Sequence, residues 1–338
     1  MFSGLSLEAI DRQHGDVAIG IDVGGTKVAL GLLDAADLRL LESVVIPTGR
    51  ERGGKAVLAD IRATAGELAG RAAALGRRVS GIGLVVPEIV SLAGEIVSSA
   101  VIPQWNELPV AEVLSEIAPV LIEADVRAAA FAETVLGAGQ GYDYLVFVTV
   151  GTGISYTAVY QGRPIAGSRG GALNIGTTIL ARLPAPHGDT GDTGDTGGTG
   201  DTGGTGELEL EGISSGRALT ERYVARGGTA EGAADVLAAA QRGDPAAAEV
   251  LDEGARTLGI AIALLVNVLD PEAVIVGGGL GSADTSYWPA TRDYARQYLH
   301  DFAAGTVLAQ GALGADAGVI GAGLTGLCGA SPGPVGPA

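Results

Sequence analysis

The run Asp22-Val23-Gly24-Gly25-Thr26-Lys27 contains the residue types that a phosphate-binding turn needs. It ends an apolar stretch, residues 17–22, that is typical of a buried strand. Because glycine has no Cβ, the backbone N–H groups of Gly24 and Gly25 can approach phosphate oxygens closely. Thr26 adds a hydroxyl donor, Lys27 adds positive charge, and Asp22 is placed to hold Mg²⁺ through water. By itself, the same run also fits a tight structural hairpin.

A second glycine turn, Gly151-Thr152-Gly153, repeats this pattern. It follows the apolar stretch 144–150 and precedes a second strand-like stretch, 155–160. The order of strand, glycine turn and strand therefore occurs twice in one chain. Such a duplication predicts two related lobes that face each other across a cleft. Because the two turns fall at matching points, we favour phosphate binding for both.

A third glycine cluster, Gly277-Gly278-Gly279, follows the short apolar stretch 273–276. Bare backbone at this point can admit an adenine ring or a ribose, although a loop with close strand–helix packing would use glycine in the same way. The chain has no G-x-x-x-x-G-K-[ST] motif, and no G-x-G-x-x-G in a strand–helix–strand context. A P-loop or a dinucleotide-binding fold is therefore not expected.

The composition narrows the class of protein further. The chain has 338 residues, enough for two domains, and 47% of them are hydrophobic. Its net charge of -18 argues against nucleic acid as a partner, because binding to a phosphate backbone needs a basic face. The single cysteine, Cys328, excludes an intramolecular disulfide. The first 16 residues lack a secretory signal, and the longest apolar run, 258–269, is too short for a bilayer. We expect a soluble cytoplasmic protein without membrane contact.

The elements that must position these turns alternate in type, which predicts an α/β fold. Strands are expected at 17–22, 27–33, 41–46, 81–86, 120–124, 144–150, 155–160 and 273–276. Helices are expected at 54–76, 126–137, 215–226, 231–241, 245–269, 285–300 and 317–328.

Residues 188–206 form a repetitive Gly-Asp-Thr insert. Its carboxylates, Asp189, Asp192, Asp195 and Asp201, are suitable ligands for Ca²⁺. A flexible solvated loop is the interpretation that we prefer. The Pro/Gly-rich tail, 331–338, is expected to be disordered.

The three glycine motifs, in this order, resemble the ROK family (repressors, uncharacterised frames and sugar kinases) of the actin-like ATPase superfamily. The closing segment 312–322 is similar as well, and the resemblance runs from about Val17 to Cys328. It implies a two-lobed actin-like ATPase (ribonuclease H-like) fold, with a cleft between the lobes. We expect an N-terminal tail at 1–16, one lobe at 17–124 plus 317–330, and a second lobe at 125–316. The resemblance also implies ATP and Mg²⁺ as cofactors and a homodimer.

The resemblance assigns Asp125 as the catalytic base. Family members carry an Asn-Asp pair at the start of a helix, and Asp125 falls on the aspartate of that pair. A carboxylate there can accept the proton of an attacking hydroxyl while a metal ion and backbone donors neutralise the γ-phosphate. The alternative is that Asp125 is only a helix N-cap, and one side chain can fill both roles.

The acceptor side departs from the family pattern. Ala124 replaces the asparagine, and Asn174-Ile175-Gly176-Thr177 stands where the family has Glu-x-Gly-His. Glu211 matches a second sugar-binding glutamate of the family, and Glu88 replaces the glycine of a Pro-Gly pair near the sugar pocket. The substrate-binding candidates are therefore Glu88, Asn174, Thr177 and Glu211, together with Asp125. Without the family's cysteine cluster, and with Thr177 in place of its histidine, no zinc site is expected.

These departures make glucose a doubtful substrate, because lost hydroxyl contacts weaken discrimination by a hydrogen-bonding pocket. Related actinomycete kinases act on amino sugars such as kanosamine, or on C7 cyclitols such as valiolone, and a similar role here would belong to antibiotic biosynthesis. We expect ATP-dependent phosphorylation of a primary hydroxyl on such a polyhydroxy compound. A catalytically inactive sugar sensor is the alternative. A repressor is disfavoured, because only about 16 residues precede the first strand and the chain is acidic.

Overall fold

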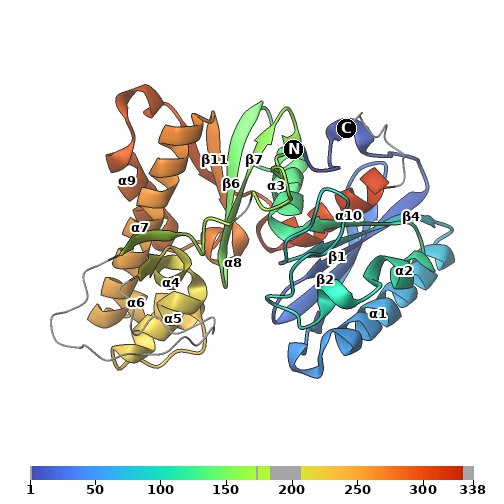
Figure 1. Cartoon of the computed structure of the whole chain (residues 1–338), viewed down its shortest axis with the longest axis horizontal. Helices are drawn as coiled ribbons and strands as arrows, with labels where there is room; N and C mark the ends of the chain where they lie inside the picture. Colours follow the sequence, from blue (N-terminus) through green and yellow to red (C-terminus); the bar gives the residue numbers. More distant parts are fainter. Residues whose placement is uncertain (1, 173, 183–206, 330–338) are drawn as a thin grey trace.

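The computed structural model describes residues 2–172, 174–182 and 207–329. Two five-stranded sheets form the centre of the molecule, and α3 (Asp125–Leu136) lies between them (Figure 1). This arrangement is the α/β architecture that the sequence predicted. The Gly-Asp-Thr insert at 188–206 and the tail at 331–338 lie outside the described residues, so their predictions stay untested.

The first sheet has the strand order β3-β2-β1-β4-β5. β1 pairs antiparallel with β2, which pairs antiparallel with β3, whereas β4 runs parallel to both β1 and β5. The strands span β1 (Asp16–Val23), β2 (Lys27–Asp34), β3 (Leu40–Pro47), β4 (Arg78–Val86) and β5 (Val120–Ala124).

The second sheet repeats this topology in the order β8-β7-β6-β11-β12. β6 pairs antiparallel with β7, β7 pairs antiparallel with β8, and β11 runs parallel to β6 and β12. The strands span β6 (Tyr144–Val150), β7 (Ile154–Tyr160), β8 (Arg163–Pro164), β11 (Ala273–Gly277) and β12 (Val307–Gln310). The predicted duplication is therefore present in the fold, and both glycine turns join the first two strands of their sheets.

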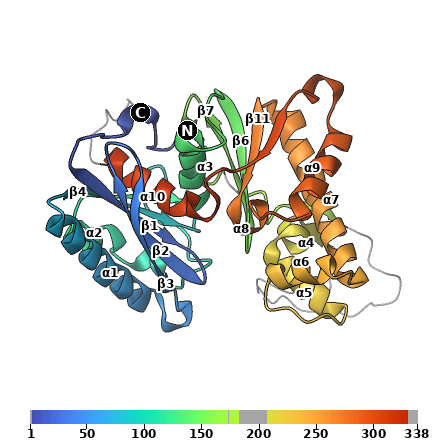
Figure 2. The same cartoon turned by 180° about the vertical axis from the view of Figure 1, so that it is seen from behind.

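The alternating side chains of β1 cover both faces of the first sheet. Ile19 and Ile21 pack into the core with α1 (Gly54–Ala74), whereas Ala18 points to the side of α10 (Ala317–Gly329). Gly20 allows α10 to approach closely, because a Cβ at this position would overlap with the α10 backbone. Figure 2 shows α10 against β1 from behind. A short helix, α2 (Val110–Ser115), precedes β5 and was not predicted.

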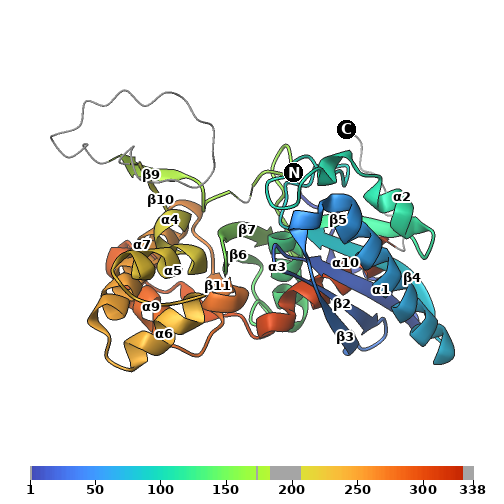
Figure 3. The same cartoon turned by 90° about the horizontal axis from the view of Figure 1, so that it is seen from below.

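The second sheet carries its own group of helices, whose core is separate from that of the first sheet. The longest, α7, begins after Asp244, whose carboxylate accepts hydrogen bonds from Ala246 and Ala247, with Pro245 as the first helical residue. It packs against α9. The helices span α4 (Glu211–Ser214), α5 (Gly216–Ala225), α6 (Ala233–Gln241), α7 (Pro245–Leu269), α8 (Gly278–Gly281) and α9 (Tyr287–Tyr298). A two-stranded sheet of β9 (Ile179–Arg182) and β10 (Glu207–Glu209) lies beyond them (Figure 3).

The segment before β1 packs against both halves of the molecule. Phe2 forms a β-bridge with Ile165 next to β8, and the Ser3 amide donates to the Pro164 carbonyl at 2.9 Å. Leu5 is fully buried in a cluster with residues of α3 and α10. The N-terminal tail predicted at 1–16 is thus anchored at these points, although most of its side chains are exposed, and its last residue, Asp16, begins β1. The boundaries predicted for the two lobes stay a prediction.

Candidate functional site

Asp22 and Asp125 are brought together at one edge of the first sheet. Asp22 pairs with Val85 of β4, and Val86 pairs with Ala124 at the end of β5. Because β1, β4 and β5 run parallel, their carboxyl ends meet at the same edge, where ligands of open α/β sheets bind. Asp125 follows β5 directly as the first residue of α3.

Both carboxyls have raised pKa values. Burial raises the pKa of Asp125 to about 7, and the negative charges of Asp22 and Glu88 add to this rise. The hydrogen bond from the Val126 N–H and the positive charge of Arg127 lower the same pKa. Burial also raises the pKa of Asp22 to about 6, against a lowering by Lys27. Strongly perturbed neighbouring carboxyls are characteristic of functional sites.

Asp125 is not the N-cap of its helix. Ala124 holds the N-cap position with extended backbone and makes no capping contact through its side chain. The Asp125 Oδ1 accepts a hydrogen bond from the Val126 amide at 2.6 Å. The helix therefore starts one residue earlier than predicted, at Asp125, and the simple capping alternative does not describe this residue.

The first glycine turn is closed by one backbone hydrogen bond and is joined to the residue after β3 by another hydrogen bond. The Gly24 amide donates to the Lys27 carbonyl at 2.9 Å, and the Thr48 hydroxyl donates to the Gly24 carbonyl at 2.7 Å. Thr26 and Lys27 are exposed. The Asp22 carboxylate lies against the first turn of α10, because a Cβ at Gly318 would overlap with it. The carboxylate is thus held beside a helix N-terminus.

The second glycine turn and the third cluster are neighbours in the second sheet. Gly277 at the end of β11 pairs with Thr149 at the end of β6. Gly278 has a φ of +83°, and a Cβ there would lie 2.6 Å from the Thr149 Oγ1, so only glycine fits. The Gly151 carbonyl accepts from the Gly216 amide at 2.7 Å, which joins the turn to α5. Gly277 to Gly279 were expected to follow the strand 273–276. In the structure Gly277 is the last residue of β11, and α8 begins at Gly278.

Glu211 lies against the second glycine turn. Its Oε2 accepts from the Ile154 amide at 3.0 Å, and a Cβ at Gly153 or Gly176 would come within 2.8 Å of the same oxygen. Asn174 and Thr177 are exposed on the turn that precedes β9. The Glu211 amide donates to the Gly176 carbonyl at 2.8 Å. Three of the five substrate-binding candidates therefore belong to one local unit.

Glu88, the fourth candidate, is 3% exposed, and its carboxylate is occupied. One oxygen accepts from the Val101 amide at 2.7 Å and the Ile102 amide at 3.2 Å. The other accepts from the Ala100 amide at 2.9 Å and the Ser98 hydroxyl at 2.6 Å. These bonds make Glu88 the anchor of the segment 98–102, and a direct contact with substrate stays a prediction.

Among the described residues, no hydrogen bond joins Asp125 to Glu211, Asn174 or Thr177. A buried side chain that was not among the predicted site residues, Arg127, links α3 to the segment that precedes Asn174, because it donates to the Gly170 carbonyl. The spacing of four residues between Glu123 and Arg127 predicted no contact, because Glu123 belongs to β5 and Arg127 to α3. The anchoring of Gly24 by Thr48 had no signal in the sequence.

No group of three or more His, Cys, Asp or Glu side chains capable of holding a metal occurs in the part of the chain that the structure describes. Asp22 still suits a hydrated Mg²⁺, because its raised pKa reflects a buried negative charge that a cation would stabilise. The residues therefore fit a metal ion held through water rather than by several side chains.

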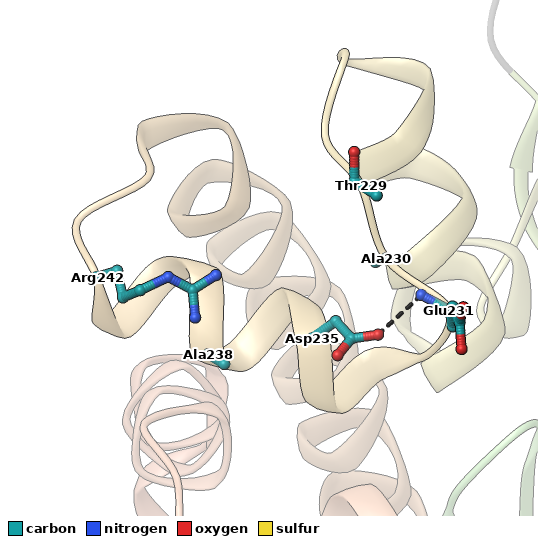
Figure 4. Close-up of a pocket in the computed structure, with 6 residues that line it drawn as sticks. All are labelled: Thr229, Ala230, Glu231, Asp235, Ala238 and Arg242. Atoms are coloured by element: carbon teal, nitrogen blue, oxygen red, sulfur yellow. Dashed lines mark hydrogen bonds between the residues drawn. The ribbon is translucent and has the colours of Figure 1, made fainter.

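A shallow hollow on the second half of the molecule carries none of the candidate residues. It lies between α6 and the segment before it, where the Asp235 carboxylate accepts from the Glu231 amide at 2.8 Å (Figure 4). We assign it no role in the site. Its lining residues are Thr229, Ala230, Glu231, Asp235, Ala238 and Arg242.

Every helix of the described residues falls short of the length and apolarity that crossing a membrane requires.

The fold matches solved structures over nearly the whole chain. A ROK hexokinase from Thermus thermophilus is 34% identical with a TM-score of 0.71, and the alignment covers 92% of this chain and 97% of that one. A ROK family glucokinase from Streptomyces griseus, solved with glucose and AMPPNP, is 26% identical with a TM-score of 0.73, covering 91% and 98%. The two mixed sheets thus form the actin-like ATPase fold of the ROK kinases, as predicted.

Sequence comparison gives the same result. A glucokinase from Halalkalibacterium halodurans is 32% identical over 321 residues, which cover 90% of this chain and 93% of the relative. The model of the ROK family matches residues 18–325. The chain therefore belongs to the ROK family.

Proposed function

We propose that the protein is an ATP-dependent kinase that transfers the γ-phosphoryl group to a primary hydroxyl of a sugar-like compound. The observation that carries the proposal is the position of Asp125, beside Asp22 and with its pKa raised to about 7. A general base works best when its pKa lies near the working pH, and this carboxyl meets that condition. The family membership and the full-length similarity to sugar kinases support the same activity.

In the proposed reaction, Asp125 accepts the proton of the acceptor hydroxyl while the oxygen of that hydroxyl forms a bond to the γ-phosphorus. The bond between that phosphorus and the β–γ bridging oxygen breaks, and ADP leaves. The amides and hydroxyls of the two glycine turns are the candidates for holding the phosphate oxygens. The third glycine cluster, next to the second turn, is the candidate for the adenosine.

Mg²⁺, when bound, neutralises the charge that develops on the phosphate oxygens. Asp22 is the residue that would hold it, because its carboxylate is at the end of β1 and is partly buried without a compensating ion pair among the described residues. Lys27 is exposed on the same turn and supplies positive charge near the phosphates.

We propose a C7 cyclitol of the valiolone type, or a modified hexose such as kanosamine, ahead of glucose as the acceptor. Ala124 is fully buried, and its methyl group cannot form a hydrogen bond with a hydroxyl of the acceptor. The Glu88 carboxylate is occupied by its own loop, which leaves Asn174, Thr177 and Glu211 to select the acceptor. This set of polar groups differs from the asparagine, glutamate and histidine of the family pattern, so a different pattern of hydroxyls should fit.

A coupled ADP-release assay with Mg·ATP tests the proposal. The acceptors are glucose, N-acetylmannosamine, kanosamine and a set of C7 cyclitols, each with the unaltered protein and with Asp125→Asn. We expect turnover on at least one acceptor, and a loss of about 10²–10⁴-fold in the variant with ATP binding retained. ATP binding without turnover on any acceptor would favour the inactive sensor instead. Turnover that survives in Asp125→Asn would contradict the role of this residue. The homodimer and the cytoplasmic location remain predictions.

A further inference from the structure

Arg127 is a fully buried arginine two residues after the proposed base. Its side chain is 1% exposed, and its guanidinium binds a carboxylate and two backbone carbonyls. The Nε donates to the Glu123 Oε1 at 2.7 Å, and Nη2 lies 2.6 Å from the same oxygen. Nη1 donates to the Gly170 carbonyl at 2.7 Å, and Nη2 donates to the Val90 carbonyl at 3.2 Å. The planar, permanently charged fork of arginine suits such a set of acceptors, which lysine cannot reproduce.

The three partners come from distant parts of the chain. Glu123 belongs to β5, Val90 follows β4 in the first sheet, and Gly170 follows β8 of the second sheet. Gly170 has a φ of +84°, and a Cβ on it would overlap with the Val90 carbonyl. The backbones of these two segments are therefore in contact, and Arg127 bridges them from the first turn of α3.

The segment that Arg127 holds leads directly to the acceptor candidates. Asn174 follows Gly170 by four residues, and the Gly176 carbonyl beyond it accepts from the Glu211 amide at 2.8 Å. Asp125 lies on the other side of the bridge, on the same helical turn as Arg127. The guanidinium thus ties the first turn of α3, which carries the proposed base, to the Gly170 carbonyl, four residues before Asn174.

We infer that Arg127 is a positioning residue for the acceptor site, which fixes the acceptor turn relative to Asp125. The inference rests on the proposed kinase function. A buried ion pair is a weak source of net stability, because desolvation offsets much of its attraction. It does set geometry, and a displacement of about 1 Å between reacting groups can cost about 10²-fold in rate. The glycine turns make no contact with Arg127 among the described hydrogen bonds, so ATP binding should not depend on it.

Steady-state kinetics of two single variants and one double variant test this role. Arg127→Lys keeps the charge but reaches fewer acceptors. Arg127→Met removes the charge, and Glu123→Gln/Arg127→Met avoids leaving a buried carboxylate alone if the single variant fails to fold. ADP release is measured on the best acceptor, with acceptor and ATP varied separately, and melting temperatures are recorded.

We expect the acceptor kcat/KM to fall about 10-fold in Arg127→Lys and about 100-fold in the methionine variants. The KM for ATP should stay within about twofold in every variant that folds. Arg78→Lys is the matched control: this arginine pairs with Asp16 at the start of β1, at the opposite end of the strand from Asp22, and both kinetic constants should be unchanged.

An unchanged acceptor kcat/KM in Arg127→Lys and in a folded methionine variant would overturn the inference alone. An equal rise in the KM values of ATP and acceptor would do the same, because it would indicate a general structural role. Absence of turnover by the unaltered protein on every acceptor would instead overturn the proposed function, and the inference with it.

Discussion

Two carboxyls at the edge of the first sheet are held in conditions that do not favour their charge. Asp22 and Asp125 are near each other, partly buried, and without an ion pair among the described residues. Glu88 and Glu123 show the opposite arrangement, since both are buried and their carboxylates accept hydrogen bonds from several donors. The carboxylates without an ion pair therefore lie where a metal ion and a reacting hydroxyl would be bound. Such groups lower the stability of the folded protein but are needed for activity, a common trade-off in enzymes.

The stability of the ligand-free protein should therefore depend on the charge of Asp125. Its pKa of about 7 in the folded state exceeds the ordinary value of 3.8, so the folded protein binds more protons than the unfolded chain between these pH values. The contribution of this group to stability is then lost as the pH rises towards 7. Asp125→Asn should raise the free energy of unfolding at pH 8 by about 1 kcal/mol, and the melting temperature by about 2 °C.

Differential scanning fluorimetry at pH 5 and pH 8, without nucleotide or metal, measures this effect. The increase in melting temperature caused by Asp125→Asn should become smaller towards pH 5. The exposed residue Asp284 provides the control, and Asp284→Asn should show no such difference between the two pH values. A lower melting temperature of Asp125→Asn at pH 8 would refute the prediction.

Glu88 should contribute to stability through the segment that it anchors. Glu88→Gln keeps one acceptor oxygen but turns an amide NH₂ towards backbone N–H donors, so buried donors lose their partners. We expect the free energy of unfolding to fall by about 2 kcal/mol, measured by urea denaturation. Glu67→Gln, on an exposed side chain of α1, should change it by less than about 0.5 kcal/mol. Equal stability of the two variants would show that the anchor is dispensable.

At the scale of elements, glycines on both sides of the contact between β1 and α10 set how closely α10 packs against the site. Gly20 of β1 lets the helix approach the sheet, and Gly318 leaves room for the Asp22 carboxylate. Glycine within a helix is otherwise unfavourable by about 1 kcal/mol relative to alanine. Its presence in the first turn of α10 is therefore explained by the close approach of the carboxylate.

Gly318→Ala should lower both stability and turnover, although alanine favours the helix. The added Cβ overlaps with Asp22 and must displace either the carboxylate or the helix. Gly66→Ala in α1 is the matched control, because no atom lies within 4 Å of the added Cβ, and it should stabilise the protein by up to about 1 kcal/mol. Thermal unfolding compares the stability of the two variants, and ADP release compares their turnover. Gly318→Ala with full turnover would show that Asp22 tolerates the displacement.

At the scale of the whole molecule, the segment before β1 ties the two sheets together. It is bonded to β8 through Ser3 and reaches α10 through Asp11, whose amide donates to the Leu327 carbonyl at 3.3 Å. Leu5, between these points, is buried with α3 and α10. The segment therefore runs from the edge of the second sheet to the helix that packs on the first.

Leu5→Ala should lower the free energy of unfolding by about 2–4 kcal/mol, because it removes a fully buried side chain and leaves a cavity. Leu7→Ala provides a control in the same segment, since Leu7 is 48% exposed and should matter much less. Urea denaturation of both variants gives the comparison. Similar losses from both would mean that Leu5 is not a core residue.

Local patterns were enough to predict much of the fold. Periodic apolar residues located α7 at 245–269 as observed, because Asp244 and Pro245 mark its start and its buried stripe is continuous. The repeated strand, glycine turn and strand pattern predicted the duplication, since such turns are encoded by neighbouring residues. β12 and α2 were missed, because short elements carry too few residues for a clear period. The sequence by itself thus determined the class of fold, the family and the position of Asp125.

Only the tertiary structure decided how the polar residues pair. Nothing local distinguishes Glu88, which binds three amides of a later loop, from a glutamate that faces a substrate. Arg127 resembled any helical arginine until the segments of Val90 and Gly170 were brought to it. Burial and hydrogen-bond partners of this kind depend on backbone contacts between residues far apart in the chain. A sequence pattern fixes neighbours along one element, whereas these contacts arise only after the sheets and helices have packed.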